Sequence, residues 1–226
     1  MINYIKKLRI VINFRNYLRT KKILSESDGL LKIDSSAGSL LYRFIKNKGI
    51  NNVLEIGTWN GLGSTLVLFE ALKNKKGHWS LTSIETDKIA YKLAKKNLKG
   101  KLGIILKLGR IIEINELPDP HLIDFRKHNL NPKNIEWFFQ DIRRYKRTKN
   151  IFSELENSYD FILFDGGEFS TFPEFKKLHL RTKYFGLDDI HTYKQYDVLQ
   201  YIKKKPELFE LIDSIKNFSI YKLNIE

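Results

Sequence analysis

Residues 53–65 of this chain, VLEIGTWNGLGST, place three glycines directly behind a short apolar run. The run at 53–56 has the length and composition of a buried strand, and residues 64–73 have the apolar spacing of a helix. Glycine permits positive φ angles and leaves no Cβ to block a ligand that lies against the backbone. The stretch therefore predicts a strand, a glycine-rich turn and a helix N-terminus, the opening unit of a nucleotide-type α/β fold.

The glycine spacing differs from two common nucleotide motifs. A dinucleotide fingerprint reads G-x-G-x-x-G, but Leu66 stands where its last glycine belongs, and the Gly-Lys-Ser/Thr ending of a phosphate loop is absent as well. The stretch resembles instead the E/D-x-G-x-x-x-G motif of class I S-adenosylmethionine-dependent methyltransferases, most closely their O-methyltransferase branch. A ligand-free tight turn between strand and helix is the alternative interpretation.

This resemblance implies that the turn binds S-adenosyl-L-methionine. It also implies that the acid at the start of the turn, Glu55, holds the amino group of the cofactor, directly or through water. The positions that the resemblance assigns to the cofactor here are Glu55, Gly57, Thr58, Gly61, Gly63 and Ser64.

An acid also ends the next expected strand, residues 79–84. Glu85 lies about 20 residues beyond the glycines, where nucleotide-type folds bind ribose hydroxyls. Because a carboxylate accepts two hydrogen bonds in fixed geometry, we predict that Glu85, with Thr86, binds the ribose. A surface acid that caps the following helix is the alternative. The third expected strand, 104–108, turns at Gly109, and the resemblance makes Arg110 an adenine-side candidate.

The second informative stretch, residues 160–168, is an apolar strand that ends in Asp165, two glycines and Glu168. Ligands of parallel sheets gather at the carboxyl ends of the strands. The stretch resembles the D-G-x-H-type motif of sugar and macrolide O-methyltransferases, with Glu168 at about the position of the histidine. Asp165 is therefore a cofactor-binding and catalytic candidate. For a metal-free reaction, Glu168, Asp165 and His191 are the candidates for the general base.

The fifth expected strand ends at Asp188 and Asp189. In catechol-type O-methyltransferases, which this region resembles, acids at the ends of the fourth and fifth strands bind a divalent metal, and Asp165, Asp188 and Asp189 match those positions. Mg²⁺ prefers oxygen ligands, and a bound cation lowers the pKa of a coordinated hydroxyl. Because adjacent acids also serve as helix caps, the sequence leaves metal-assisted and metal-free transfer both open.

These elements predict an α/β fold with a Rossmann-like, doubly wound and mostly parallel seven-stranded sheet. Residues 208–212 and 218–223 are expected to pair as an antiparallel C-terminal edge hairpin, by which the resembling family closes its sheet. We expect a basic, amphipathic helical arm and a loop at 1–39. A methyltransferase domain follows at 40–226, with an insertion at about 111–147.

The expected insertion contains one clear helix signal. Asn131 and Pro132 form a cap and first-turn pair, and apolar residues follow at helical spacing up to Tyr145. We expect this helix to border the substrate pocket. The two histidines of the segment, His121 and His128, are expected at the surface.

The chain carries 40 Lys and Arg against 26 Asp and Glu, a net charge of +14. Because the basic residues are spread through nearly every segment, nucleic-acid binding is not the favoured interpretation. An anionic or sugar-linked small substrate suits the charge, and so does an anionic membrane surface contacted by residues 1–22. Packing of that arm on its own domain, or on a second subunit of a homodimer, is favoured over the membrane.

The resemblance thus implies an S-adenosylmethionine-dependent O-methyltransferase that acts on a hydroxyl of a sugar or small polar metabolite. An RNA methyltransferase and a non-catalytic cofactor-binding protein of the same fold are the alternatives. The chain has no cysteine, which excludes disulfides and thiolate metal sites. Arg9 and Arg15 interrupt any signal-peptide core, so a cytoplasmic location is expected.

Overall fold

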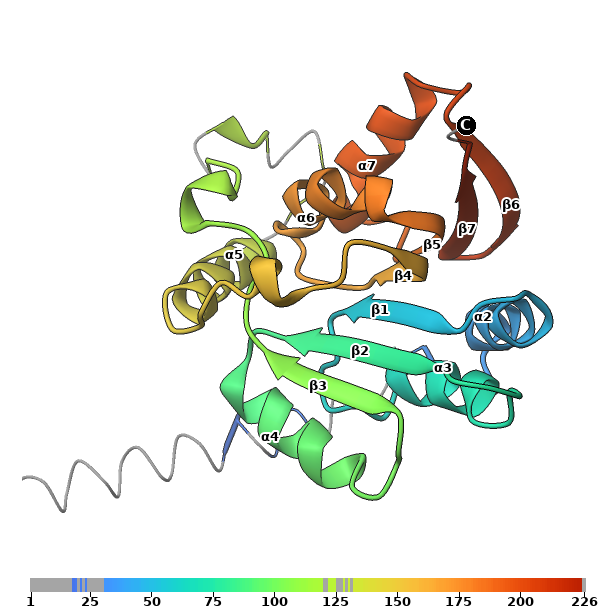
Figure 1. Ribbon diagram of the computed structural model, residues 1–226. Coiled ribbons are helices and arrows are strands. Elements are labelled where there is room, and N and C mark those ends of the chain that lie inside the picture. The colour runs from blue at the N-terminus through green and yellow to red at the C-terminus, as the bar shows by residue number, and fades with distance from the viewer. Residues whose placement is uncertain are drawn as a thin grey trace, which may run out of the picture.

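A seven-stranded sheet runs through the centre of the molecule in the order β3-β2-β1-β4-β5-β7-β6 (Figure 1). The computed structural model describes residues 18, 19, 21, 23, 31–119, 122–124, 128, 130 and 132–224. The strands are β1 (Asn52–Ile56), β2 (Ser80–Glu85), β3 (Ile104–Leu108), β4 (Tyr159–Phe164), β5 (Thr182–Asp188), β6 (Phe209–Ile215) and β7 (Phe218–Leu223).

Strands β1 to β5 are parallel, whereas β7 pairs antiparallel with both β5 and β6. The expected mostly parallel sheet with an antiparallel edge hairpin is therefore confirmed. β1 and β4 lie at the centre because their side chains are buried on both faces, as continuous apolar runs require. Leu54 and Ile56 pack into one hydrophobic cluster, and Val53 packs into the other on the opposite face.

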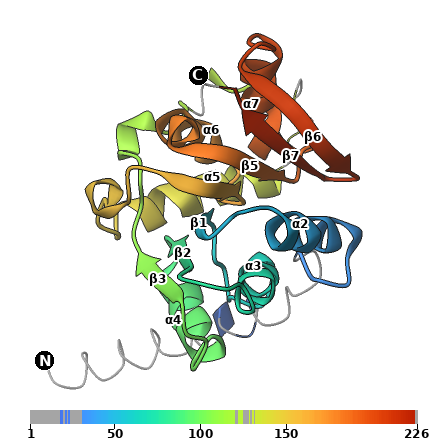
Figure 2. The same cartoon turned by 45° about the vertical axis from the view of Figure 1, so that its right-hand side comes forward.

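Helices cover both faces of the sheet (Figures 1 and 2). On one face lie α2 (Ser36–Asn47), α3 (Ser64–Leu72) and α4 (Lys88–Asn97). On the other lie α5 (Pro132–Tyr145), α6 (Thr171–Leu178) and α7 (Tyr193–Lys203). Short 3₁₀ turns occupy Ile114–Glu116, Phe152–Glu154 and His179–Arg181.

Helix α2 begins inside the segment 1–39 in which an arm and a loop were expected. Residues 36–38 form the first turn of this helix. The reason is a cap, because the Ser35 side chain accepts a hydrogen bond from the backbone N–H of Gly38 at 3.0 Å.

The expected insertion contains α5, which connects β3 to β4. This connection crosses from one edge of the sheet to the other side of β1, so the strand order reverses between β1 and β4. Ligands of open α/β sheets bind at such a switch point, outside the carboxyl ends of the strands. In α5, Phe138 and Tyr145 are buried as their spacing predicted, whereas Phe139 is half exposed.

The few described residues of the N-terminal arm contact the same domain. Ile23 is buried, and Arg19 forms an ion pair with Asp87. Most of the expected arm and loop, residues 1–17, 20, 22 and 24–30, lies outside the described residues, as do His121 and Asn131. Within the described part of the chain, no helix has the length and apolar character that a membrane span needs.

Candidate functional site

A cavity of about 350 Å³ lies at the carboxyl ends of β1, β2 and β4. Its size falls in the range of small-molecule and cofactor sites. The switch between β1 and β4 therefore does hold a pocket. The predicted site residues that line it are Gly57, Glu85, Thr86, Arg110, Asp165, Asp188 and Asp189.

The glycine turn crosses closely over neighbouring backbone. Gly57 has a φ of +102°, and a Cβ at this position would lie 2.1 Å from the carbonyl oxygen of Asp165. Gly61 has a φ of +77°, and its Cβ would lie 2.8 Å from Leu98 Cδ1. The backbone N–H groups of Gly57 and Thr58 both donate to the Ile84 carbonyl. Packing thus requires two of the three glycines, and the turn brings the ends of β1, β2 and β4 together.

Glu55 lies under this turn and is fully buried. Its carboxylate accepts hydrogen bonds from the hydroxyls of Ser64 at 2.6 Å, Thr65 at 2.7 Å and Ser83. Burial raises the pKa of Glu55 to about 7. Because Glu55 is not among the described residues that line the cavity, this geometry favours an indirect contact with a ligand over a direct one.

Glu85 ends β2 and lines the cavity. Its two carboxylate oxygens accept hydrogen bonds from the backbone N–H groups of Trp59 at 2.7 Å and Asp87 at 2.6 Å. Burial raises the pKa of Glu85 to about 7. Asp87 is the residue that caps α4, by accepting from Ile89 and Ala90. The capping role therefore belongs to Asp87, and Glu85 faces the cavity.

Arg110 follows β3 and also lines the cavity. Its guanidinium donates to Glu113 at 2.7 Å and to the Thr148 carbonyl at 3.0 Å. Its Nε atom is buried and has no partner among the described residues.

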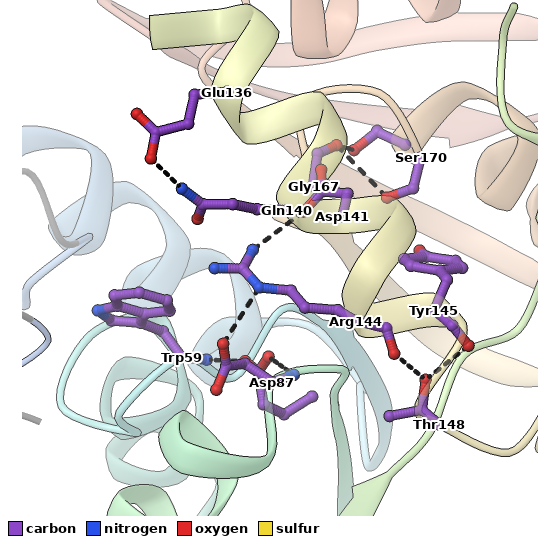
Figure 3. A network of polar contacts seen from close by, with 12 residues as sticks. Trp59, Asp87, Glu136, Gln140, Asp141, Arg144, Tyr145, Thr148, Gly167 and Ser170 are labelled. Carbon is purple, nitrogen blue, oxygen red and sulfur yellow. Dashed lines mark hydrogen bonds and ion pairs between the residues drawn. The ribbon is translucent and has the colours of Figure 1, made fainter. Parts of the chain in front are cut away.

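Helix α5 adds a buried ionic network that the sequence analysis did not single out (Figure 3). Arg144 lies between two acids: its Nε is 3.1 Å from Asp87 Oδ2 and its NH1 is 2.9 Å from Asp141 Oδ1. Burial raises the pKa of Asp141 to about 6. Both Asp141 and Arg144 line the cavity, so α5 borders it and is tied to the start of α4. The i, i+3 spacing of an acid and an arginine was the available sequence signal.

Glu174 is a further buried carboxylate that lines the same cavity. Tyr145 Oη donates to Glu174 Oε1 at 2.5 Å, and Glu174 Oε2 has no partner among the described residues. Burial raises the pKa of Glu174 to about 7. Sequence reasoning missed this residue, because nothing in the chain near position 174 resembles a site motif.

The three acids expected at the ends of β4 and β5 do come together. Asp165, Asp188 and Asp189 each offer a carboxylate oxygen, and these oxygens lie within 4.8 Å of one another. A lysine that the sequence analysis did not single out reaches into this group. The Nζ of Lys194 is 2.7 Å from Asp165 Oδ1 and 3.0 Å from Asp189 Oδ2.

The charges of this group shift one another. Although burial lowers it, Asp165 and Asp189 raise the pKa of Lys194 above its ordinary value. Burial, with the neighbouring Asp165, raises the pKa of Asp188. Lys194 is therefore a fixed ammonium at this edge of the sheet.

The structure separates the remaining two candidates for the general base. Glu168 is half buried, and burial raises its pKa. His191 is exposed, and its Nε2 lies 3.0 Å from the Lys216 carbonyl. Glu168 lines a second cavity next to the first, whereas His191 is not among the described residues that line either cavity.

The second cavity adjoins the first and is larger, about 1110 Å³. The two share wall residues, among them Gly166, Asp189 and Lys194. Four exposed basic residues line the larger cavity: Lys88 and Lys92 of α4, Arg143 of α5, and Arg147 in the turn that follows α5. A small ligand in the first cavity and an anionic one in the second would meet at the shared wall.

No protein-family model and no curated protein matches this sequence. Solved structures match most of its length. A methyltransferase from Geobacter sulfurreducens has a TM-score of 0.57 at 12% identity, over 94% of this chain and 90% of that one. The O-methyltransferase TomG from Streptomyces achromogenes, which is involved in tomaymycin synthesis and was solved in complex with SAM, has a TM-score of 0.56 at 13% identity. The match covers 91% of this chain and 86% of that one.

An O-methyltransferase from Bacillus cereus in complex with SAH has a TM-score of 0.53 at 16% identity, over 91% of this chain and 90% of that one. At these identities the similarity shows the fold. It confirms the Rossmann-like, mostly parallel seven-stranded fold that the sequence predicted.

Proposed function

We propose that this chain is an S-adenosylmethionine-dependent O-methyltransferase, with the cofactor in the smaller cavity and the acceptor in the larger. One observation carries the proposal: Glu85 presents a buried carboxylate to the cavity at the switch point, where it is hydrogen-bonded to the glycine turn through the backbone N–H of Trp59. Two of the similar structures, named above, were solved with SAM or SAH, which supports this choice of ligand.

The donor set fits the cofactor. Each oxygen of Glu85 accepts one backbone N–H and keeps a lone pair for a ribose hydroxyl. Ile84 and Ile111 offer apolar surface in the same cavity for a base. Asp165 places negative charge beside the cavity, where it favours a cationic ligand end. When bound, the cofactor supplies a methyl group on a sulfonium sulfur.

This chain's own residues would align the acceptor and remove its proton. We assign the general base to Glu168, because it is a half-buried acid of the acceptor cavity whose pKa burial raises, whereas Asp189, the other half-buried acid of this cavity, is paired with Lys194.

If Glu85 binds the ribose, the affinity of the protein for adenosine should depend on pH. Adenosine carries the ribose but not the amino acid part of the cofactor. Because burial raises the pKa of Glu85 to about 7, this carboxyl must lose a proton before both its oxygens can accept hydroxyls. The affinity for adenosine is therefore expected to rise by up to about tenfold per pH unit below neutrality and to level off above it.

Calorimetric titration of the wild type and of Glu85→Ala with adenosine, S-adenosylmethionine and S-adenosylhomocysteine measures these affinities. Loss of charged hydrogen bonds of this kind costs about 1–3 kcal/mol, so S-adenosylmethionine and S-adenosylhomocysteine should bind about 5- to 150-fold more weakly to the variant. The pH dependence of adenosine binding should disappear with the carboxyl. Unchanged affinity in Glu85→Ala would contradict the ribose role.

We further infer that the acceptor is an anionic small molecule, such as a sugar that carries a phosphate or nucleotide. The support is the basic wall of the larger cavity: Lys88, Lys92, Arg143 and Arg147 make no ion pair within the described residues. Trp137 lies on the same wall and offers an aromatic face. Guanidinium groups suit phosphate oxygens because of their paired donors.

Charge reversal of the wall tests this inference. Arg143→Glu with Arg147→Glu is expected to weaken the binding of inorganic pyrophosphate by at least about tenfold, while S-adenosylhomocysteine binds as before. Lys203→Glu with Lys204→Glu, at the far end of α7, is the matched control. Tight and steeply salt-dependent binding of RNA, lost in the same double variant, would favour the RNA methyltransferase instead.

A further inference from the structure

We propose that Lys194 is the cation of the strand-end acid group, so that methyl transfer by this chain needs no divalent metal. The inference rests on the proposed function and deepens it. Its starting point is geometric: the ammonium of Lys194 lies between Asp165 and Asp189, two of the three residues that would ligate a metal.

The residues present do not fit a divalent ion. Mg²⁺ requires ligand oxygens at about 2.0–2.1 Å in near-octahedral geometry. Asp165 Oδ1 and Asp189 Oδ2, however, already contact Lys194 Nζ at 2.7 and 3.0 Å. An ion bound to these same oxygens would lie beside an ammonium, and like charges at that separation repel.

Lys194 is held in this position. It is the second residue of α7 and its side chain is only 6% exposed. The next residue, Gln195, is fully buried, and its amide donates to the carbonyls of Phe164 at 3.0 Å and Asp188 at 2.9 Å. Gln195 thereby fastens the start of α7 to the ends of β4 and β5. Lys194 would have to leave a buried position to make room for an ion.

The position is also the one where a cation would act. Lys194 and Asp189 line both cavities, so the ammonium faces the shared wall at which acceptor and cofactor would meet. The acceptor hydroxyl gives its proton to Glu168, and its oxygen forms a bond to the methyl carbon. The carbon–sulfur bond breaks and its electron pair stays on sulfur. An N–H of Lys194 stabilises the negative charge that develops on the acceptor oxygen.

Metal binding tests the proposal without any need for an acceptor. Wild-type protein is titrated with Mn²⁺, followed by electron paramagnetic resonance, and with S-adenosylhomocysteine, followed by calorimetry. We expect S-adenosylhomocysteine to bind with the same affinity with and without EDTA. We expect no saturable Mn²⁺ site at this acid group. Saturable Mn²⁺ binding that Asp165→Asn abolishes would overturn the proposal.

Removal of the ammonium should create the missing site. Lys194→Met leaves three carboxylates together, so its Mn²⁺ affinity is expected to rise by at least about tenfold over the wild type. Lys194→Arg keeps the charge and should not gain the site. Lys205→Met, on the turn after α7, is the control. Equal Mn²⁺ binding in Lys194→Met and wild type would contradict the inference.

Different results would contradict the proposed function and the role of Lys194. If S-adenosylhomocysteine does not bind the wild type, the proposed function is wrong. If it binds, and Mn²⁺ also occupies the acid group of the wild type, only the role of Lys194 is wrong. Should Lys194→Met fail to fold, the wild-type titrations still decide.

Discussion

Gly57→Ala is expected to lower the free energy of unfolding by about 2–5 kcal/mol, the sum of about 1–2 for the backbone conformation and 1–3 for overpacking. The residue has a φ of +102°, and the new Cβ would lie 2.1 Å from the Asp165 carbonyl oxygen. A carbonyl of the main chain cannot turn aside as a flexible side chain can. Urea denaturation measures the loss.

Substitutions at two other glycines separate the cost of the backbone conformation from the cost of overpacking. Gly100 also has a positive φ, +82°, but a Cβ there would meet nothing within 4 Å, so Gly100→Ala should show only the conformational cost of about 1–2 kcal/mol. Gly49 has open space and no positive φ, so Gly49→Ala should stay within about 0.5 kcal/mol. If Gly57→Ala costs no more than Gly100→Ala, the close approach to Asp165 is not a packing constraint.

Arg144→Met is expected to cost about 3–5 kcal/mol at about pH 8, because it leaves the buried carboxylate of Asp141 without its cation and leaves Asp87 with Arg19 alone. Asp87 and Asp141 both contact this guanidinium, and their side chains are only 3% and 6% exposed. The loss should be smaller at about pH 5, since burial already raises the pKa of Asp141 to about 6 and the protonated acid needs no cation. Urea denaturation at both pH values provides the measurement.

The neighbouring arginine of the same helix is the matched control. Arg143 is exposed and forms no ion pair within the described residues, so Arg143→Met should change stability by less than about 0.5 kcal/mol. A cost for Arg144→Met that does not depend on pH would mean that packing of the arginine stem, and not its charge, stabilises α5 on the sheet.

The strands and their mostly parallel arrangement could be predicted because each strand carries a local signal. The apolar runs at β1 and β4 and the turn glycines between β1 and α3 are contiguous in sequence. Glu85 could be found for the same reason: an acid that directly ends a strand is brought to the carboxyl edge of the sheet by the strand itself. The gathering of Asp165, Asp188 and Asp189 follows from the same rule.

Lys194 and Arg144 could not be found this way, because their partners come from other elements. A lysine in the first turn of a helix is usually solvated, and nothing in residues 190–196 indicates that this one turns back to the strand ends. The contact between Arg144 and Asp87 joins residues 57 positions apart. It depends on the path of α5 across the sheet, which is set by tertiary packing.

Glu55 shows that a motif position does not by itself decide whether a side chain contacts a ligand. Its motif position assigned it to the ligand, yet three hydroxyls of the chain itself surround the carboxylate. A motif gives the place of a residue in the fold, and the neighbours decide how many of its hydrogen-bonding sites remain for anything else.

The C-terminal hairpin has a consequence for the behaviour of the chain in a crowded solution. An outermost strand offers unpaired peptide groups to which a strand of another molecule can add, and such growth leads toward aggregates. In β6 the pairing is irregular between Leu211 and Asp213, and Glu210 and Asp213 are exposed on the same strand. Irregular pairing and acidic side chains both oppose the addition of a further strand, so this border of the molecule resists self-association despite a sequence rich in isoleucine and phenylalanine.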